Sequence, residues 1–137
     1  MTDITYKVEN NLEPVEFIDV LNRSTLGERR PVNDFNRIKK MCENANLIVT
    51  ARLEEKLIGV ARSITDFVYF TYLSDLVVDE AYQKKGIGKK LLEETKNQAM
   101  QAKLILLSAP AAVNYYPKIG LKKHKHCFIL DDINELK

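Results

Sequence analysis

The stretch from Asp75 to Glu93 constrains this chain most, because an apolar run passes through two glycines into an amphipathic helical pattern. The apolar run is typical of a buried strand. Four lysines then crowd the start of the predicted helix: Lys84, Lys85, Lys89 and Lys90. A helix N-terminus carries partial positive charge and normally attracts Asp or Glu rather than Lys. The lysine excess therefore indicates an anion bound by the free amides of the first helical turn.

The loop between this strand and helix fits neither of two familiar phosphate motifs. A Walker loop requires GxxxxGK[ST], a spacing that the run Gly86-Ile87-Gly88-Lys89 lacks. A dinucleotide fingerprint requires a third glycine, where this chain has Leu91. Two glycines still let a backbone approach a ligand and turn several amides toward it, which suits a pyrophosphate. The alternative is a plain strand-to-helix turn with solvated lysines.

The whole chain has the composition of an ordinary globular domain. It has 137 residues, 45% of them hydrophobic, and a net charge of only +2, so a single domain over residues 1–137 is expected. No apolar run approaches the roughly 18 residues of a membrane span. The N-terminus is too polar for a secretory signal, and the two cysteines form no CxxC pair. A cytoplasmic protein with reduced, core-packed Cys42 and Cys127 is predicted.

Apolar periodicity predicts the α/β fold class, with a mixed central sheet flanked by helices. Strands are expected at 4–8, 47–52, 57–64, 68–78, 104–108 and 127–130, and helices at 14–26, 34–44, 88–102 and 110–116. Gly27 is expected to end the first helix, and Phe35, Ile38, Met41 and Cys42 to face inward from the second. The strands at 68–78 and 104–108 are expected to form a right-handed crossover around the third helix.

Two motifs together resemble the GNAT superfamily of N-acetyltransferases. The first is an apolar strand followed by [QR]-x-x-G-x-[GA], whose defining positions are filled by Gln83, Gly86 and Gly88. The second is an aromatic residue, then Tyr-x-x-x-Gly and an apolar residue, matched by Tyr115, Tyr116, Gly120 and Leu121. The resemblance implies a GNAT fold, acetyl-CoA as co-substrate and a primary amine as acceptor. It also implies direct attack in a ternary complex, without a covalent enzyme intermediate or a metal.

The resemblance also assigns roles to individual residues. Backbone groups of the strand would pair with the pantetheine arm, at Leu76, Val77 and Val78. Backbone amides of the loop would hold the pyrophosphate, from Gln83 through Lys84, Lys85, Gly86, Ile87 and Gly88 to Lys89. Asn114 is a further candidate for binding the cofactor, the alternative being a polar position on a short helix.

Two residues are candidates for the chemistry. Tyr116 matches the family position that protonates the leaving thiolate, and the pKa of a tyrosine, about 10, suits that transfer. The alternative is a core aromatic, although Tyr115 is the better packing candidate. Asp75 lies in an apolar strand, where a raised pKa would suit a general base. It could equally be a hydrogen-bonded structural residue or orient the amine, and Ser74 is expected on the opposite face.

Other functions remain open at this point. A non-catalytic acyl-CoA-binding sensor or interaction module would keep the loop and use Tyr116 only for packing. A nucleic-acid module would rest on the lysine clusters alone and is disfavoured, because no reading helix or aromatic ladder is present. A metal site at His124 and His126 is disfavoured, because no third ligand is evident. For Arg29 and Arg30 two alternatives are open, recognition of an acidic substrate or simple solvation. A homodimer is left open without a sequence feature to support it, and no feature identifies the acceptor amine.

Overall fold

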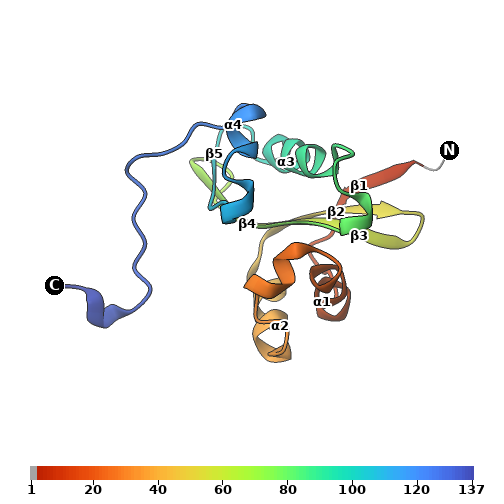
Figure 1. Ribbon diagram of the computed structural model, residues 1–137, viewed down its shortest axis with the longest axis horizontal. Helices are drawn as coiled ribbons and strands as arrows, with labels where there is room; N and C mark the ends of the chain where they lie inside the picture. The colour runs from red at the N-terminus through yellow and green to blue at the C-terminus, as the bar shows by residue number, and fades with distance from the viewer. Residues whose placement is uncertain (1–2) are drawn as a thin grey trace. The chain divides into compact units, whose positions relative to one another are not determined.

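The computed structural model describes residues 3–137 of the chain. Two compact units are present, one ending at Leu107 and the other covering Ser108–Lys137. The first unit is built on a five-stranded sheet with its strands in chain order (Figure 1). The strands are β1 (Ile4–Val8), β2 (Leu47–Leu53), β3 (Lys56–Thr65), β4 (Phe70–Val78) and β5 (Lys103–Leu106).

The sheet is mixed, as the sequence predicts. The first four strands pair antiparallel with their neighbours, whereas β4 and β5 run parallel. Helix α3 (Ile87–Gln98) makes the connection that a parallel pair requires. The predicted α/β fold class is therefore confirmed, and the β4–α3–β5 unit follows the expected order along the chain.

Helices cover both faces of the sheet. Helices α1 (Pro14–Asn22) and α2 (Phe35–Asn44) lie on one face and α3 on the other (Figure 1). Each face has its own apolar cluster, centred on Phe17 and Ile38 under α1 and α2, and on Leu91 under α3. Gly59 of β3 permits a close approach of α3, since an added Cβ would lie 3.0 Å from the Leu91 side chain. None of the described helices is both long enough and apolar enough to cross a bilayer.

The first helix is shorter than predicted. Helix α1 ends at Asn22 rather than Leu26, and a 3-10 helix, η1 (Thr25–Arg29), follows it. Ser24 makes this break, because its hydroxyl accepts the Leu26 N–H (3.0 Å) and donates to a carbonyl of the preceding turn (2.8 Å). Gly27 lies inside η1 instead of ending α1. An added Cβ there would lie 2.7 Å from the Leu21 carbonyl oxygen, so the tight packing of η1 on α1 requires glycine.

The second helix begins as predicted, with the Asp34 carboxylate accepting the Arg37 N–H (3.1 Å). Ile38 and Cys42 are buried and Met41 is half-buried, as expected. The expectation for Phe35 is wrong, since this side chain is 47% exposed. It occupies the first position of α2, where the chain arrives from an exposed loop.

The last two strands differ in burial. Along β4, buried residues alternate with half-buried ones, and both faces are covered, because Leu73 packs in the cluster under α3 and Val77 in the cluster under α1 and α2. Along β5, half-buried residues alternate with exposed ones, which corrects the expectation of a buried strand. The physical reason is position, because β5 is the edge strand and has β4 as its only strand neighbour.

Helix α3 begins one residue earlier and ends four residues earlier than predicted. Leu91 and Thr95 are buried along it, whereas Ala99 and Ala102 are buried beyond its end. Ala99 leaves the helical conformation at φ −143°, which ends the helix at Gln98. The predicted apolar face is therefore correct, but its last two members belong to the turn that leads into β5.

The second unit contains only short helices. They are η3 (Pro110–Ala112), α4 (Tyr115–Lys118) and η4 (Ile133–Glu135). The strand predicted at 127–130 is wrong: no strand is present in Ser108–Lys137, and Phe128 is 88% exposed. A strand needs a neighbour for its backbone groups, and composition alone does not supply one. Cys127 is consequently exposed, and His124 and His126 lie at a turn rather than on a strand face.

The two cysteines are expected to differ in reactivity. Cys42 is buried, and loss of hydration raises the pKa of its thiol to about 11. At pH 8 the thiolate fraction of Cys42 is therefore about 100-fold lower than that of a thiol with the ordinary pKa. Cys127, by contrast, is exposed to solvent. Ellman's reagent should label one thiol per native chain, and mass mapping should find the label at Cys127. Unfolding in guanidinium should release the second thiol, and equal labelling of both in the native protein would contradict the placement of Cys42.

Candidate functional site

The turn from β4 into α3 presents a row of unused backbone donors. Gly86 is the N-cap of α3 at φ +82°, and neither a capping side chain nor an acidic residue in the first turn is present. Lys84 also has a positive φ, +65°. Among the described residues, the amides from 84 to 89 find no hydrogen-bond acceptor. Free N–H groups at a helix N-terminus form a site for an anion, as the sequence predicts for this loop.

The lysines around this turn are not equivalent. Lys90 pairs with Glu94 (3.3 Å) and Glu93 (3.6 Å), and its pKa is raised, mainly by the hydrogen bond to Glu94. The other three lysines of the loop have no acidic partner within residues 3–137. Lys85 instead lies over the Tyr82 ring, 5.7 Å from its centroid. Three positive charges therefore remain available beside the free amides.

Side chains on the β4 side of the turn fix its shape. The Gln83 side-chain amide donates to the Val78 carbonyl (3.0 Å), which joins the loop to the end of β4. The Asp79 carboxylate accepts the Ala81 N–H (2.9 Å) and begins the 3-10 helix η2 (Glu80–Tyr82). Ile87 is buried, so only its backbone can contact a ligand. The side chains of Gln83 and Asp79 thus fix the shape of the loop, and its backbone amides remain free.

One edge of β4 is open beside this turn. Its pairing with β5 ends at Leu73 opposite Leu106, whereas its pairing with β3 continues to Val78. From Ser74 to Val78, therefore, no strand of the described chain covers the second edge of β4. The positions predicted to bind the pantetheine arm lie here, at Leu76, Val77 and Val78. An extended ligand bound along this edge would have one end beside the free amides of the turn.

Asp75 lies at the start of the open edge and is fully buried. One carboxylate oxygen accepts a hydrogen bond from Arg30 Nε and the other from Arg62 Nε. Arg30 also donates to the Ser74 carbonyl (2.9 Å), and Arg62 to the Ser74 hydroxyl (3.0 Å). With both oxygens held by guanidinium groups, the arrangement favours the structural alternative for Asp75 over the general base.

A β-bulge explains why Ser74 and Asp75 share a partner. Arg62 stands opposite Asp75 and Ser63 opposite Leu73, so Ser74 is the extra residue on β4. Strict alternation predicts Ser74 on the opposite face from Asp75, and this prediction is wrong because the bulge interrupts the alternation. Ser74 Oγ consequently reaches the same guanidinium as Asp75.

Sequence reasoning missed Arg62 and did not foresee the role of Arg30. Arg30 is only partly exposed and is committed to Asp75 and Ser74, so it is not free to meet an acidic substrate. Arg62 is buried in a mostly apolar strand. The sequence did contain a signal for this pair. Arg62 and Asp75 are single charged residues in two successive, mostly apolar strands, and buried charges occur in pairs.

A second ion pair holds the N-terminal end of the segment 23–30, which ends at Arg30. Arg23 pairs with the buried Asp79 and donates to the Leu57 carbonyl (2.9 Å). The Arg23 carbonyl in turn accepts the Glu80 N–H (2.9 Å). The segment 23–30 is thereby tied to β4 at Asp75 and to the end of β4 at Asp79. Both ends of the segment are therefore anchored to β4 or to the residues that directly follow it.

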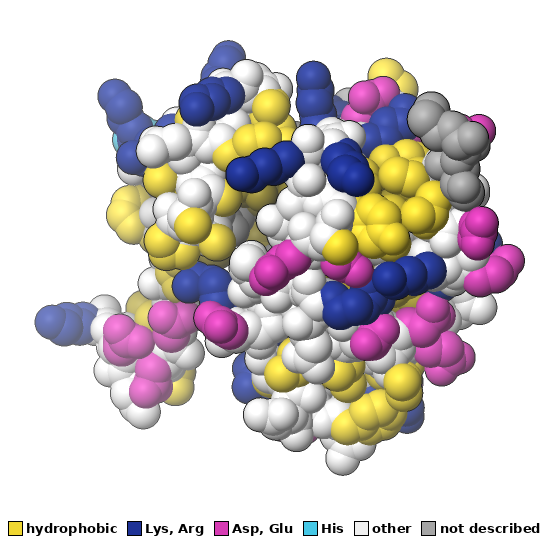
Figure 2. All heavy atoms as spheres, turned by 45° about the vertical axis from the view of Figure 1, so that its right-hand side comes forward, with side chains coloured by type: hydrophobic (Ala, Val, Ile, Leu, Met, Phe, Trp, Pro, Cys, Tyr) yellow, Lys and Arg dark blue, Asp and Glu magenta, His cyan; other side chains and the backbone are white. Residues whose placement is uncertain are grey.

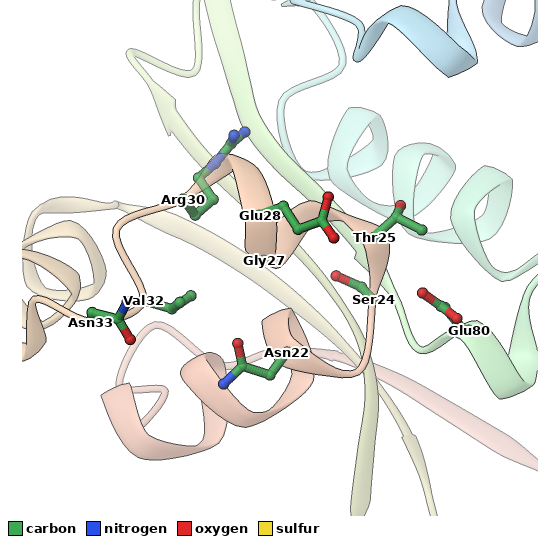
Figure 3. Close-up of a pocket in the computed structure, with 9 residues that line it drawn as sticks. All are labelled: Asn22, Ser24, Thr25, Gly27, Glu28, Arg30, Val32, Asn33 and Glu80. Atoms are coloured by element: carbon green, nitrogen blue, oxygen red, sulfur yellow. The ribbon is translucent and has the colours of Figure 1, made fainter.

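A pocket of about 500 Å³ lies between this segment and η2 (Figure 3). Its lining is largely polar: Asn22, Ser24, Thr25, Gly27, Glu28, Arg30, Val32, Asn33 and Glu80. Figure 3 shows the Arg30 side chain turned away from Glu28, in keeping with its bonds to Asp75 and Ser74. The pocket is a candidate site for a second substrate.

The remaining predicted site residues belong to the second unit. Tyr116 is half-buried, and loss of hydration, with a smaller contribution from Tyr115, raises the pKa of its phenol above 10. The two rings stand edge to face, 5.3 Å apart, and Tyr115 is the more exposed of the pair. Asn114 is exposed and makes no capping hydrogen bond at the start of α4. A phenol with a raised pKa keeps its proton at neutral pH, as a proton donor must. Within residues 3–137, no three His, Cys, Asp or Glu side chains are grouped to hold a metal ion.

Comparison with known sequences gives a consistent result. Residues 25–134 match the model of the GNAT acetyltransferase domain. The chain is 32% identical over 72 residues to GCN5-related N-acetyltransferase 2, chloroplastic, of Arabidopsis thaliana, covering 50% of this chain and 28% of that protein. It is 26% identical over 102 residues to the uncharacterized N-acetyltransferase ycf52 of Pyropia yezoensis, covering 69% of this chain and 57% of that protein. The chain spans 28% to 59% of the length of such curated relatives.

Solved structures share the fold at low sequence identity. A GNAT-family acetyltransferase of Streptococcus pneumoniae superposes with a TM-score of 0.76 at 19% identity, covering 96% of this chain and 98% of that one. An aminoglycoside N-acetyltransferase solved in complex with CoA gives 0.74 at 10% identity, covering 97% of both chains. Since the family model covers most of its residues, this chain belongs to the GNAT family of acetyltransferases.

Proposed function

We propose that this protein transfers an acetyl group from acetyl-CoA to a primary amine. The observation that carries the proposal is the row of free amides at residues 84–89, placed at the end of the open edge of β4. Main-chain donors, a left-handed Gly86 and unpaired lysines fit a diphosphate. A protein of the same fold, the aminoglycoside N-acetyltransferase, was solved with CoA.

Positioning would supply most of the catalysis. Backbone groups of residues 76–78 would hold the pantetheine arm, and the turn at 83–89 the pyrophosphate, leaving the thioester near the bulge at Ser74. A neutral amine nitrogen would then bond to the thioester carbonyl carbon as the carbon–sulfur bond breaks. The amine loses one proton and the thiolate gains one. Such alignment is worth roughly 7–11 kcal/mol of the barrier in favourable cases.

The two predicted catalytic residues receive different roles. We assign Tyr116 as the donor of the proton to the leaving thiolate, supported by its motif position and its raised pKa. Asp75 was a candidate base, but both its oxygens are held by guanidinium groups. It therefore acts in this proposal as a positioning residue for the segment 23–30, and the proton of the amine leaves through water.

Tyr116→Phe is expected to lower kcat by about 100-fold, because it removes the general acid and retains the ring. The KM for acetyl-CoA should stay within twofold of its original value. Steady-state kinetics over several amines measures both quantities, and Tyr115→Phe, which removes the neighbouring hydroxyl, is the matched control. An unchanged kcat with every amine tested would exclude Tyr116 from the reaction.

A panel of amines tests the function itself. With acetyl-CoA as donor, acetylation of at least one primary amine should release free CoA thiol. The amine should gain about 42 mass units, because an acetyl group replaces one hydrogen. Mass spectrometry avoids the background from the exposed Cys127 thiol. Binding of acetyl-CoA without transfer to any amine would instead support the acyl-CoA-binding sensor.

Three other expectations stay predictions. The cytoplasmic location is one, and the Arabidopsis relative is described as chloroplastic. The absence of nucleic-acid binding is another, although Figure 2 shows acidic side chains beside basic ones across the middle of that face. A single domain over residues 1–137 is the third. Low-salt binding assays and limited proteolysis address the last two.

A further inference from the structure

The pocket between the segment 23–30 and η2 has an unbalanced charge. Glu28 enters it from η1 and Glu80 from η2, on separate walls (Figure 3). Neither carboxylate takes part in an ion pair within the described residues. Arg30 is the one basic residue of the lining, and its charge is already shared with Asp75. Both side chains are exposed, so the pocket presents two solvated negative charges that no ion pair compensates.

The pocket also lies along the edge where the acyl arm is proposed to lie. Arg30 contacts Ser74 and Asp75 where the open edge begins. Glu80 follows directly after the end of β4 and bonds through its N–H to the Arg23 carbonyl. The two ends of the lining thus flank the open edge, so a ligand in the pocket lies beside the strand that would hold the thioester.

The walls of the pocket are held in place. The ion pairs Arg23–Asp79 and Arg30–Asp75 fix the segment at both ends, and Ser24 ties it to α1. Gly27 packs against the Leu21 carbonyl within the same segment. A cavity bounded by fixed backbone holds Glu28 and Glu80 in its lining before any ligand arrives. Little ordering is then needed when a cationic group binds between them.

The charge of the pocket restricts the acceptor. A carboxylate stabilises a nearby ammonium and so opposes the loss of its proton, which an attacking amine must undergo. An amine with a single nitrogen would be held by Glu28 or Glu80 in its unreactive form. An amine with two separated nitrogens avoids this conflict, because one end stays charged at the carboxylates while the other loses its proton near the thioester. Acidic acceptors would be repelled.

We propose that this pocket is the acceptor site and that it selects amines with a second positive charge, of the diamine and polyamine class. Glu28 and Glu80 bind the distal ammonium group. The inference rests on the acetyl transfer proposed above, and it names the substrate class of the same site. Both residues are specificity-determining and neither takes part in the bond changes.

Putrescine and n-butylamine form a matched pair, because they share a four-carbon chain and differ in the second amine. The unmodified protein should acetylate putrescine with a kcat/KM about tenfold or more above that for n-butylamine. Glu28→Gln and Glu80→Gln should each raise the KM for putrescine about fivefold, with kcat and the KM for acetyl-CoA unchanged. Glu55→Gln, an exposed carboxylate in the β2–β3 turn, is the control and should change nothing. Equal use of the two amines, or a double variant that keeps its KM for putrescine, would overturn the inference.

Binding of spermidine separates this inference from the proposed function. Calorimetry without acetyl-CoA should detect spermidine binding that weakens with salt and is lost in the Glu28→Gln, Glu80→Gln double variant. If acetyl-CoA binds but no amine is acetylated, the proposed function fails while this titration still tests the pocket. Undetectable spermidine binding, or a higher kcat/KM for lysine-containing peptides than for diamines, would contradict the assigned substrate class.

Discussion

Replacing Gly86 with aspartate is expected to weaken CoA binding by about 100-fold or more and to leave the fold intact. The new carboxylate would stand at the N-cap of α3, where the free amides and unpaired lysines would hold the diphosphate. A negative charge there repels the phosphates and offers the amides an internal acceptor. An added Cβ has no protein atom within 4 Å, so the fold has room for it. Calorimetric titration with CoA measures the effect.

Gly86→Asn is the matched control for this substitution. Asparagine has nearly the same shape as aspartate, tolerates the positive φ of this position and carries no charge. Its CoA affinity should fall much less than that of the aspartate variant, which separates repulsion from strain. Circular dichroism should show that both variants are folded. CoA affinity of a folded Gly86→Asp variant within threefold of the original would place the phosphates elsewhere.

Asp75→Asn is expected to lower the free energy of unfolding by about 3–5 kcal/mol, because it leaves two guanidinium groups without their shared carboxylate. Asp75 is fully buried and the Arg62 side chain is only 8% exposed, so water cannot replace the lost charge. For a chain of this size the melting temperature should fall by roughly 10 °C or more. Thermal unfolding followed by circular dichroism measures it.

Two comparisons sharpen this test. Arg62→Ala should cost more stability than Arg30→Ala, because Arg30 is 22% exposed and can be hydrated in part. Asp131→Asn removes an exposed carboxylate that forms no ion pair within the described chain, and it should leave the melting temperature unchanged. A melting temperature for Asp75→Asn within 2 °C of the original would show that the ion-pair cluster does not stabilise the fold.

The turn with free amides before α3 could be predicted because its signal is local. Two glycines and four lysines lie within seven residues, directly after an apolar strand. The free amides follow from the absence of any capping residue before α3, which is also visible in the sequence. Helix caps and glycine conformations depend on near neighbours, so a sequence pattern is sufficient for them.

The ion pairs of Asp75 and the pocket beside them could not be predicted in this way. Asp75 has partners at Arg30 and Arg62, and Glu28 shares a pocket with Glu80. These residues are brought together by the sheet register and by the bulge at Ser74, neither of which leaves a periodic pattern. The strand predicted at 127–130 failed for the opposite reason, because its composition suits a strand but no neighbouring strand pairs with it.

A titration of isotope-labelled protein with CoA, followed by amide NMR spectra, tests the placement of the diphosphate most directly. The backbone N–H signals of residues 84–89 should shift more than those of any other segment, because their hydrogens gain phosphate oxygens as acceptors. The same signals should move less with a pantetheine that lacks the diphosphate. Saturation with CoA that leaves these six amides unchanged would contradict the assignment of this turn as the binding site.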